Sequence, residues 1–324
     1  MTKPTASLSL DLDNKWAYLR AHDDSAWQAR PSYLPRVVER IDGFFADHGL
    51  RATVFVVGED LARSEDRDAV ARLAYSGHEI GNHSQNHYPW LADLPRDEVE
   101  GQVARAEEAI AALTGTPPVG FRAPGFSWSD TLLEVLAERG YRYDASVFPT
   151  VIGPLAGLYS KLLLRRGKQP ADEDRPPQRF ASLADAFRPL RPRALEATQS
   201  RLVEAPVTTM PVFRLPVHFT YVSYLGQFST SAAAAYQRAA LAACRLRGVG
   251  PSMLLHPLDF LGPEDEPDLA FFPGMKLAWP AKRRLLDSLV DGLRKSWQVG
   301  PVAEHAAEAS PVRSGAAPQP AAQP

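Results

Sequence analysis

The feature that most constrains the fold is a regular alternation of short apolar, strand-like runs with longer segments of helical periodicity. Two of the helical segments, 33–48 and 97–113, each place their apolar residues on a single stripe. Such alternation predicts an α/β fold with a mainly parallel sheet. The strands are expected at 8–13, 52–58, 78–83, 119–123, 142–146, 202–208 and 252–256.

The first of these strands carries two carboxylates on one face. Apolar and polar residues alternate in the run LSLDLD at 8–13, so Ser9, Asp11 and Asp13 face away from the three leucines. An isolated pair of this kind is most often the solvated face of an edge strand. The pair indicates a site only if other candidate ligands accompany it.

Two histidines, His83 and His87, are such candidates. Their four-residue spacing predicts that both imidazoles lie on one helical face and can bind a single cation. Asp11 or Asp13 can add a third ligand, which leaves one position open for water, as in catalytic zinc sites. The other carboxylate can then act as general base, kept ionised by a forked contact from Arg122. Zinc is the expected metal, and the same donors accept cobalt, nickel or iron.

Together with three later motifs, these residues resemble the polysaccharide deacetylase family, the carbohydrate esterases that carry a NodB homology domain. The later motifs are RAP at 122–124, DAS at 144–146 and LHP at 255–257, and all five occur in family order. The first motif is similar to a D-x-D variant rather than to the usual T-F-D-D-G. The resemblance implies a distorted (β/α)7 barrel with catalytic groups at the strand ends.

The resemblance also implies roles on the metal side of the site. Asp11 is the catalytic base, and Arg122 orients it. The metal ligands are Asp13, His83 and His87.

On the leaving-group side, the resemblance implies that His256 protonates the departing amine and that Asp144 hydrogen-bonds to His256 and orients it. Pro257 follows His256 where the family more often has Asp. In the R-x-P motif that ends at Pro124, the next residue, Gly125, is expected to offer its N–H to the tetrahedral oxyanion.

The implied activity is metal-dependent removal of an N-acetyl group from a sugar of a polysaccharide, a lipid-linked sugar or a precursor saccharide, with release of acetate. Two alternatives stay open: the same site acting on another bond (an O-acetyl, a formamide or a ring amide), or a catalytically silent glycan- or lipid-binding module. With 36 basic and 38 acidic residues, the net charge of −2 gives no electrostatic case for nucleic-acid binding. No apolar signal segment precedes the first strand, so a cytoplasmic location is expected.

The stretch 148–202 is longer than a barrel connection requires and predicts an insertion or lid within one catalytic domain, 1–305. Its apolar beginning, 151–166, either packs over the barrel or mediates self-association into a homo-oligomer, or it contacts a membrane or lipid-linked substrate peripherally. The last segment, 306–324, is rich in Ala, Pro, Ser and Gln and predicts a disordered tail.

An aromatic stretch at 213–228 includes Phe219, Tyr221 and Tyr224, which either line a sugar site or pack in the core. The single cysteine, Cys244, is expected to be a buried structural thiol. No function is assigned to four further histidines, His22, His48, His218 and His305.

Overall fold

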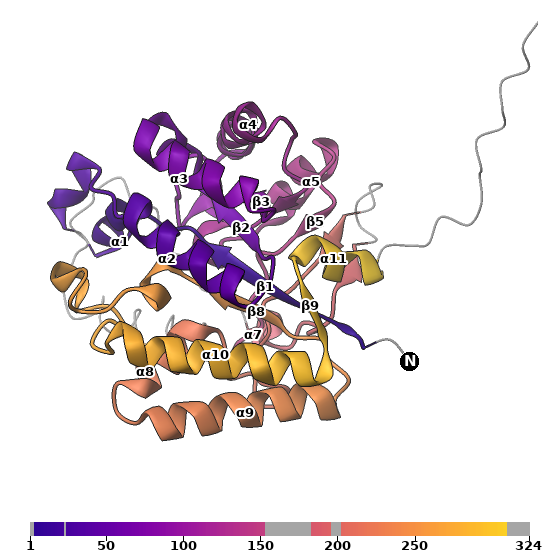
Figure 1. Ribbon diagram of the computed structural model, residues 1–324. Coiled ribbons are helices and arrows are strands. Elements are labelled where there is room, and N and C mark those ends of the chain that lie inside the picture. Colours follow the sequence, from indigo (N-terminus) through magenta and orange to yellow (C-terminus); the bar gives the residue numbers. More distant parts are fainter. Residues whose placement is uncertain (1–2, 23, 153–182, 196–201, 310–324) are drawn as a thin grey trace, which may run out of the picture.

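The structure, a computed structural model, describes residues 3–22, 24–152, 183–195 and 202–309. Within these residues, helices surround a central nine-stranded sheet (Figure 1). The strands are β1 (Thr5–Asp11), β2 (Thr53–Val56), β3 (Glu79–Asn82), β4 (Gly120–Phe121), β5 (Tyr143–Asp144), β6 (Arg193–Ala194), β7 (Val203–Glu204), β8 (Ser252–Leu255) and β9 (Gln298–Gly300). The helices are α1 (Lys15–Ala21), α2 (Leu34–Asp47), α3 (Ser64–Tyr75), α4 (Arg96–Thr114), α5 (Asp130–Glu138), α7 (Leu183–Ala186), α8 (Phe219–Gly226), α9 (Thr230–Leu246), α10 (Trp279–Ser296) and α11 (Val302–Ala306).

Seven strands correspond to the seven predicted from the sequence, and they run parallel in the order β7-β5-β4-β3-β2-β1-β8. The backbone N–H of Thr208, just beyond β7, donates to the carbonyl of Ser252 in β8 at 3.0 Å, which links the two edges of this set. The predicted distorted (β/α)7 barrel is therefore confirmed. Two short strands were not predicted: β6 pairs antiparallel with β7, and β9 pairs parallel with the first half of β1.

The alternation of residues in β1 sorts its side chains between two buried layers. Leu8 and Leu10 join the main hydrophobic core, which also contains residues of α2 and α10. Ser9 and Asp11 instead contact Arg122 inside the barrel. Since β1 is a central strand and Asp11 is only 4% exposed, the carboxylates do not form the solvated face of an edge strand.

The two predicted amphipathic helices are present as α2 and α4. Pro35 occupies the first turn of α2, where its missing N–H costs no helical hydrogen bond, and the chain turns after the helix at Gly49, whose φ is 53°. Their apolar stripes are buried. Neighbouring helices α2, α3, α4 and α5 pack in succession, and α8, α9 and α10 form a second packed group (Figure 1).

The described part of the predicted insertion 148–202 contains α7 and β6. From residue 153 onward, the apolar segment 151–166 lies outside the described residues. Helical structure continues through Ala309, inside the segment predicted as a tail, and 310–324 lies outside the described residues. In the described chain, no helix combines the length and apolar character needed to cross a membrane.

Candidate metal centre and active site

Asp13, His83 and His87 form a cradle of potential metal ligands at the ends of β1 and β3. Their ligand atoms all lie within 4.8 Å of one another. Asp13 Oδ1 is 3.3 Å from His83 Nε2 and 3.0 Å from His87 Nε2, yet this buried oxygen makes no well-directed hydrogen bond within the described residues. Burial opposes ionisation of Asp13, but the two facing imidazoles outweigh burial and hold its pKa well below the usual value. These donors converge as the ligands of one cation would.

The two histidines reach the cradle from a loop, so the predicted placement on one helical face is wrong. Residues 83–87 follow β3 without helical structure, and Ser84 and His87 have φ values of 64° and 51°. The side chain of Asn82 accepts from the N–H of Ser84 at 2.8 Å, and the hydroxyl of Ser84 accepts from the N–H of His87 at 3.2 Å. This left-handed turn brings the two rings to a centroid distance of 5.1 Å.

A backbone contact fixes the orientation of the His83 ring, and Arg20 holds the main chain of His87. His83 Nδ1 is 2.7 Å from the carbonyl oxygen of Arg122, which can only accept, so Nδ1 carries the proton and Nε2 is free to bind a metal. Arg20 donates to the carbonyls of Asn86 and His87. Its guanidinium lies within 6 Å of four aromatic rings, those of Trp16, Trp27, Tyr88 and Trp90.

Arg122 holds Asp11 beside the cradle. Its Nη1 donates to Asp11 Oδ1 at 2.7 Å and to Ser9 Oγ at 2.8 Å, and its Nε donates to the carbonyl of Ala145 at 3.0 Å. The contact therefore uses one nitrogen, not the two of the predicted fork. Asp11 Oδ2 is 4.0 Å from His83 Nε2. Asp11 is thus next to the cradle without joining it, as a base beside a metal requires.

Asp144 does not make its expected contact with His256. Its carboxylate accepts from the hydroxyl of Ser146 at 2.5 Å and from the N–H of Ser146 at 3.2 Å. Ser146 Oγ in turn accepts from the N–H of Ala123 at 2.8 Å. Burial raises the pKa of Asp144 to about 7. Asp144 therefore supports the loop after Arg122 through Ser146 rather than orienting His256.

His256 is oriented instead by Thr220 and Asp259. Thr220 Oγ1, at the start of α8, lies 3.0 Å from His256 Nδ1 and 3.3 Å from Asp259 Oδ2. Asp259 Oδ2 also accepts from the N–H of His256 at 2.8 Å, which closes a capping box on the 3₁₀ turn Pro257–Phe260. With Nδ1 engaged, Nε2 is the nitrogen of His256 left for a substrate.

Gly125 lies in the 3₁₀ turn Pro124–Phe126, directly after the predicted R-x-P motif. Its φ is 59°, and a Cβ at this position would approach the side chain of Pro89 to 3.2 Å, so the turn favours glycine. Among the described residues, no acceptor receives a hydrogen bond from the Gly125 N–H. A cavity of about 340 Å³ is lined by Gly125 together with Asp11, Asp13, His83, His87 and His256. The structure therefore brings the predicted metal ligands, Asp11, Gly125 and His256 to one cavity, whereas Arg122, Pro124 and Asp144 do not line it.

A family model described as polysaccharide deacetylase matches residues 18–143, which include His83, His87 and Arg122. A peptidoglycan-N-acetylglucosamine deacetylase of Bacillus cereus is 33% identical over 92 residues, which are 28% of this chain and 31% of that protein. A chitooligosaccharide deacetylase of Sinorhizobium fredii is 36% identical over 112 residues, or 34% of this chain and 48% of that protein.

Residues 18–143 thus resemble the polysaccharide deacetylase family.

A crystal structure from Mycobacterium smegmatis, provisionally assigned to the polysaccharide deacetylases, covers 98% of this chain and 96% of its own with a TM-score of 0.62 and 20% identity. This likeness extends the shared fold over nearly the whole chain. The chain spans about a third to a half of the length of the two deacetylases above. This chain therefore matches only part of each of these two deacetylases.

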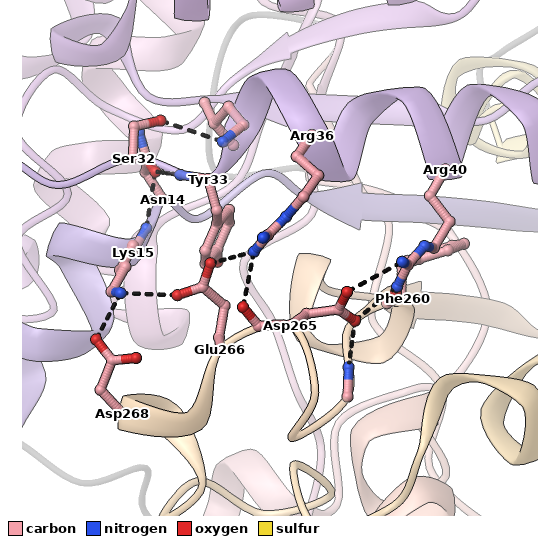
Figure 2. Close-up of polar contacts among 12 residues, drawn as sticks. Asn14, Lys15, Ser32, Tyr33, Arg36, Arg40, Phe260, Asp265, Glu266 and Asp268 are labelled. Atoms are coloured by element: carbon pink, nitrogen blue, oxygen red, sulfur yellow. Dashed lines mark hydrogen bonds and ion pairs between the residues drawn. The ribbon is translucent and has the colours of Figure 1, made fainter.

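Ion pairs join two parts of the chain that supply the site (Figure 2). Lys15, two residues after Asp13, pairs with Glu266 at 2.7 Å and with Asp268 at 2.5 Å. Arg40 of α2 donates through both terminal nitrogens to Asp265, at 2.8 and 3.1 Å. The loop that follows the 3₁₀ turn of His256 is thereby tied to the segments on either side of the cradle.

Sequence reasoning missed three residues around His256: Thr220, Asp259 and His218. The ring of His218 lies 5.6 Å from that of His256, and no function was assigned to it. The spacing of His256 and Asp259, three residues apart across a proline, is a capping-box signal that could have revealed Asp259. Thr220 carried no such signal, because only the packing of α8 brings it to His256.

Proposed function

We propose that the protein is a metal-dependent deacetylase that removes an N-acetyl group from a sugar and releases acetate. The observation that carries this proposal is the convergence of Asp13, His83 and His87 within 4.8 Å, with Asp11 beside them and His256 on the same cavity. The deacetylases that the chain matches support an N-acetylated saccharide as the substrate class. A polysaccharide, a lipid-linked sugar and a precursor saccharide all belong to this class.

The cradle fits one divalent cation, with zinc as the proposed metal. One carboxylate and two imidazoles provide three ligands and leave a position open, as in catalytic zinc sites. The buried Oδ1 of Asp13, which faces both imidazoles without a well-directed hydrogen bond, and the fixed tautomer of His83 suit such a ligand set. Cobalt, nickel or iron could use the same donors. When bound, the metal would acidify water and polarise the acetyl carbonyl.

The remaining residues divide the proton transfers between them. Asp11, held by Arg122, takes a proton from the attacking water. The N–H of Gly125 stabilises the negative charge that develops on the acetyl oxygen. His256, oriented by Thr220, gives a proton to the departing nitrogen so that it leaves as an amine.

The first test is metal content per chain, measured by elemental analysis on folded wild type, His83→Ala and the control His22→Ala. We expect about one metal in wild type and in His22→Ala, whose histidine is exposed, and little in His83→Ala. Equal content in His83→Ala and wild type, or no metal in wild type after reconstitution, would reject the cradle.

The second test separates the base from the ligands. We expect Asp11→Asn to retain metal but to lose acetate release from N-acetylated chito-oligosaccharides, because it keeps the shape of the side chain without its basicity. Normal acetate release in this variant would exclude Asp11 as the base. Release of another acid from an alternative acyl substrate, with none from the sugar, would redirect the assignment to that bond.

A further inference from the structure

A second cavity of about 370 Å³ adjoins the catalytic one, and the two share His256, Tyr18, Phe126 and Phe272. The walls of this second cavity, the aromatic chamber, are mainly apolar. They are formed chiefly by Phe126, Tyr221, Tyr224, Leu258, Phe272 and Pro273. In the part of the chain that the structure describes, no Lys, Arg, Asp or Glu lines the chamber. A volume of this size is typical of a small-ligand site.

The position of the chamber relates it to one part of the substrate, on the basis of the proposed function. The metal ligands and Asp11 line only the catalytic cavity, so the acetyl carbonyl belongs there. His256 stands at the boundary and faces the departing nitrogen. The portion of the substrate beyond that nitrogen, the sugar and its substituents, is therefore directed toward the chamber.

Two buried polar groups stand near the boundary and have no hydrogen-bond partner within the described residues. They are the hydroxyl of Tyr18, which lines both cavities, and Nδ1 of His218, which lines the chamber. Burial raises the pKa of Tyr18 and lowers that of His218, so both groups are neutral near pH 7. Unpaired neutral groups of this kind suit the hydroxyls of a sugar ring, because buried polar atoms otherwise carry a desolvation cost.

Beyond these groups, apolar surface leads outward along α8. Tyr224 is 43% exposed, and its ring contacts that of Phe228, which is 76% exposed, edge to face at 5.4 Å. A second sugar of a polysaccharide would bury hydroxyls here without enough partners, which is costly. An apolar group would lose no such hydrogen bonds.

We infer that the aromatic chamber binds an uncharged, apolar aglycone, an alkyl or aryl group attached to the N-acetylated sugar. The chamber then favours an amphiphilic glycoside over a polysaccharide chain as the substrate of this site. Each methylene buried in such a chamber contributes about 0.8 kcal/mol, which corresponds to roughly a fourfold change in affinity.

The test is the dissociation constant of methyl, butyl and octyl glycosides of N-acetylglucosamine, each below its micelle concentration, for the full-length metal-loaded protein. We expect affinity to rise up to about fourfold per methylene from methyl to butyl. Tyr224→Ser should reduce the butyl-to-methyl ratio. Tyr75→Ser is the matched control, since this tyrosine of α3 is 96% exposed and does not line the chamber, and it should leave the ratio unchanged.

Acetate release is measured on the same samples, so that a failure of the chamber inference can be distinguished from a failure of the proposed function. Tightening with chain length without acetate release would support the chamber and reject deacetylation of these sugars. Acetate release with no chain-length dependence of affinity would overturn the chamber inference and leave the proposed function standing. Equal ratios in Tyr224→Ser and wild type would also overturn the chamber inference, and so would tighter binding of chito-oligosaccharides than of butyl glycosides.

Discussion

Thr220→Val tests whether the hydroxyl of Thr220 orients the catalytic acid. A hydroxyl has one proton, so Thr220 Oγ1 can donate it to Asp259 Oδ2 at 3.3 Å while accepting from His256 Nδ1 at 3.0 Å. The variant keeps the shape of the side chain and removes both contacts. Asp259 still accepts from the N–H of His256 at 2.8 Å, so the turn itself should persist.

The expected loss follows from the one hydrogen bond that fixes the ring. A neutral hydrogen bond contributes about 0.5–1.5 kcal/mol, which corresponds to roughly a two- to twelvefold decrease in kcat. KM and metal content should change little, because Thr220 contacts none of the cradle residues. A loss confined to kcat indicates that the acid is misplaced in the transition state rather than that substrate binding is weakened.

Ser223→Ala is the matched control. Ser223 lies in the same helix, is buried, and its hydroxyl has no hydrogen-bond partner within the described residues. Its removal should leave kcat unchanged. The assay is acetate release from an N-acetylated glycoside, and ¹⁵N NMR of the imidazole nitrogens reports which of them carries the proton in each variant. Equal kcat values and equal ring spectra for Thr220→Val and Ser223→Ala would refute the orienting role of Thr220.

Two further predictions concern metal affinity and acid stability. Arg20→Gln should weaken metal binding by about tenfold, because the carbonyl of His87 loses its donor. The measurement is a chelator competition. Arg51→Gln is the control, since Arg51 is exposed, and it should leave metal affinity unchanged. Burial lowers the pKa of His305 to about 4, below its unfolded value near 6.5, so its contribution to stability is complete above pH 6.5 and is lost as pH falls toward 4. Wild type should therefore lose about 2 kcal/mol more than His305→Gln between pH 8 and pH 5 in urea unfolding, and equal losses would contradict this assignment.

The barrel strands could be predicted because each is a short apolar run bounded by a helix of clear periodicity. Their parallel order followed from this alternation and from the family resemblance. The strands that escaped prediction, β6 and β9, have two and three residues and no apolar pattern. β6 pairs with β7, which follows shortly after it in the sequence, whereas β9 pairs with β1 from the other end of the described chain.

The candidate metal ligands, which the structure brings together, could be chosen from their chemistry, but their geometry could not be predicted. A four-residue spacing is compatible with a helix, and the same spacing is met here by a turn with left-handed residues at Ser84 and His87. The turn is stabilised by side chains of Asn82 and Ser84, which the spacing of the histidines does not reveal. The convergence of candidate ligands is thus a more robust inference from sequence than the element that carries them.

The misplaced role of Asp144 shows where sequence reasoning about this site is weakest. Asp144 ends β5 and reaches the loop after Arg122, whereas the partners of His256 come from α8 and from the 3₁₀ turn beside it. The family match ends at residue 143 and covers the histidine ligands and Arg122. The acid, its two partners and most of the chamber lie beyond residue 143. Since those residues lie on the proposed leaving-group side, the substrate preference proposed for this protein should respond to changes in 218–273 while its metal affinity does not.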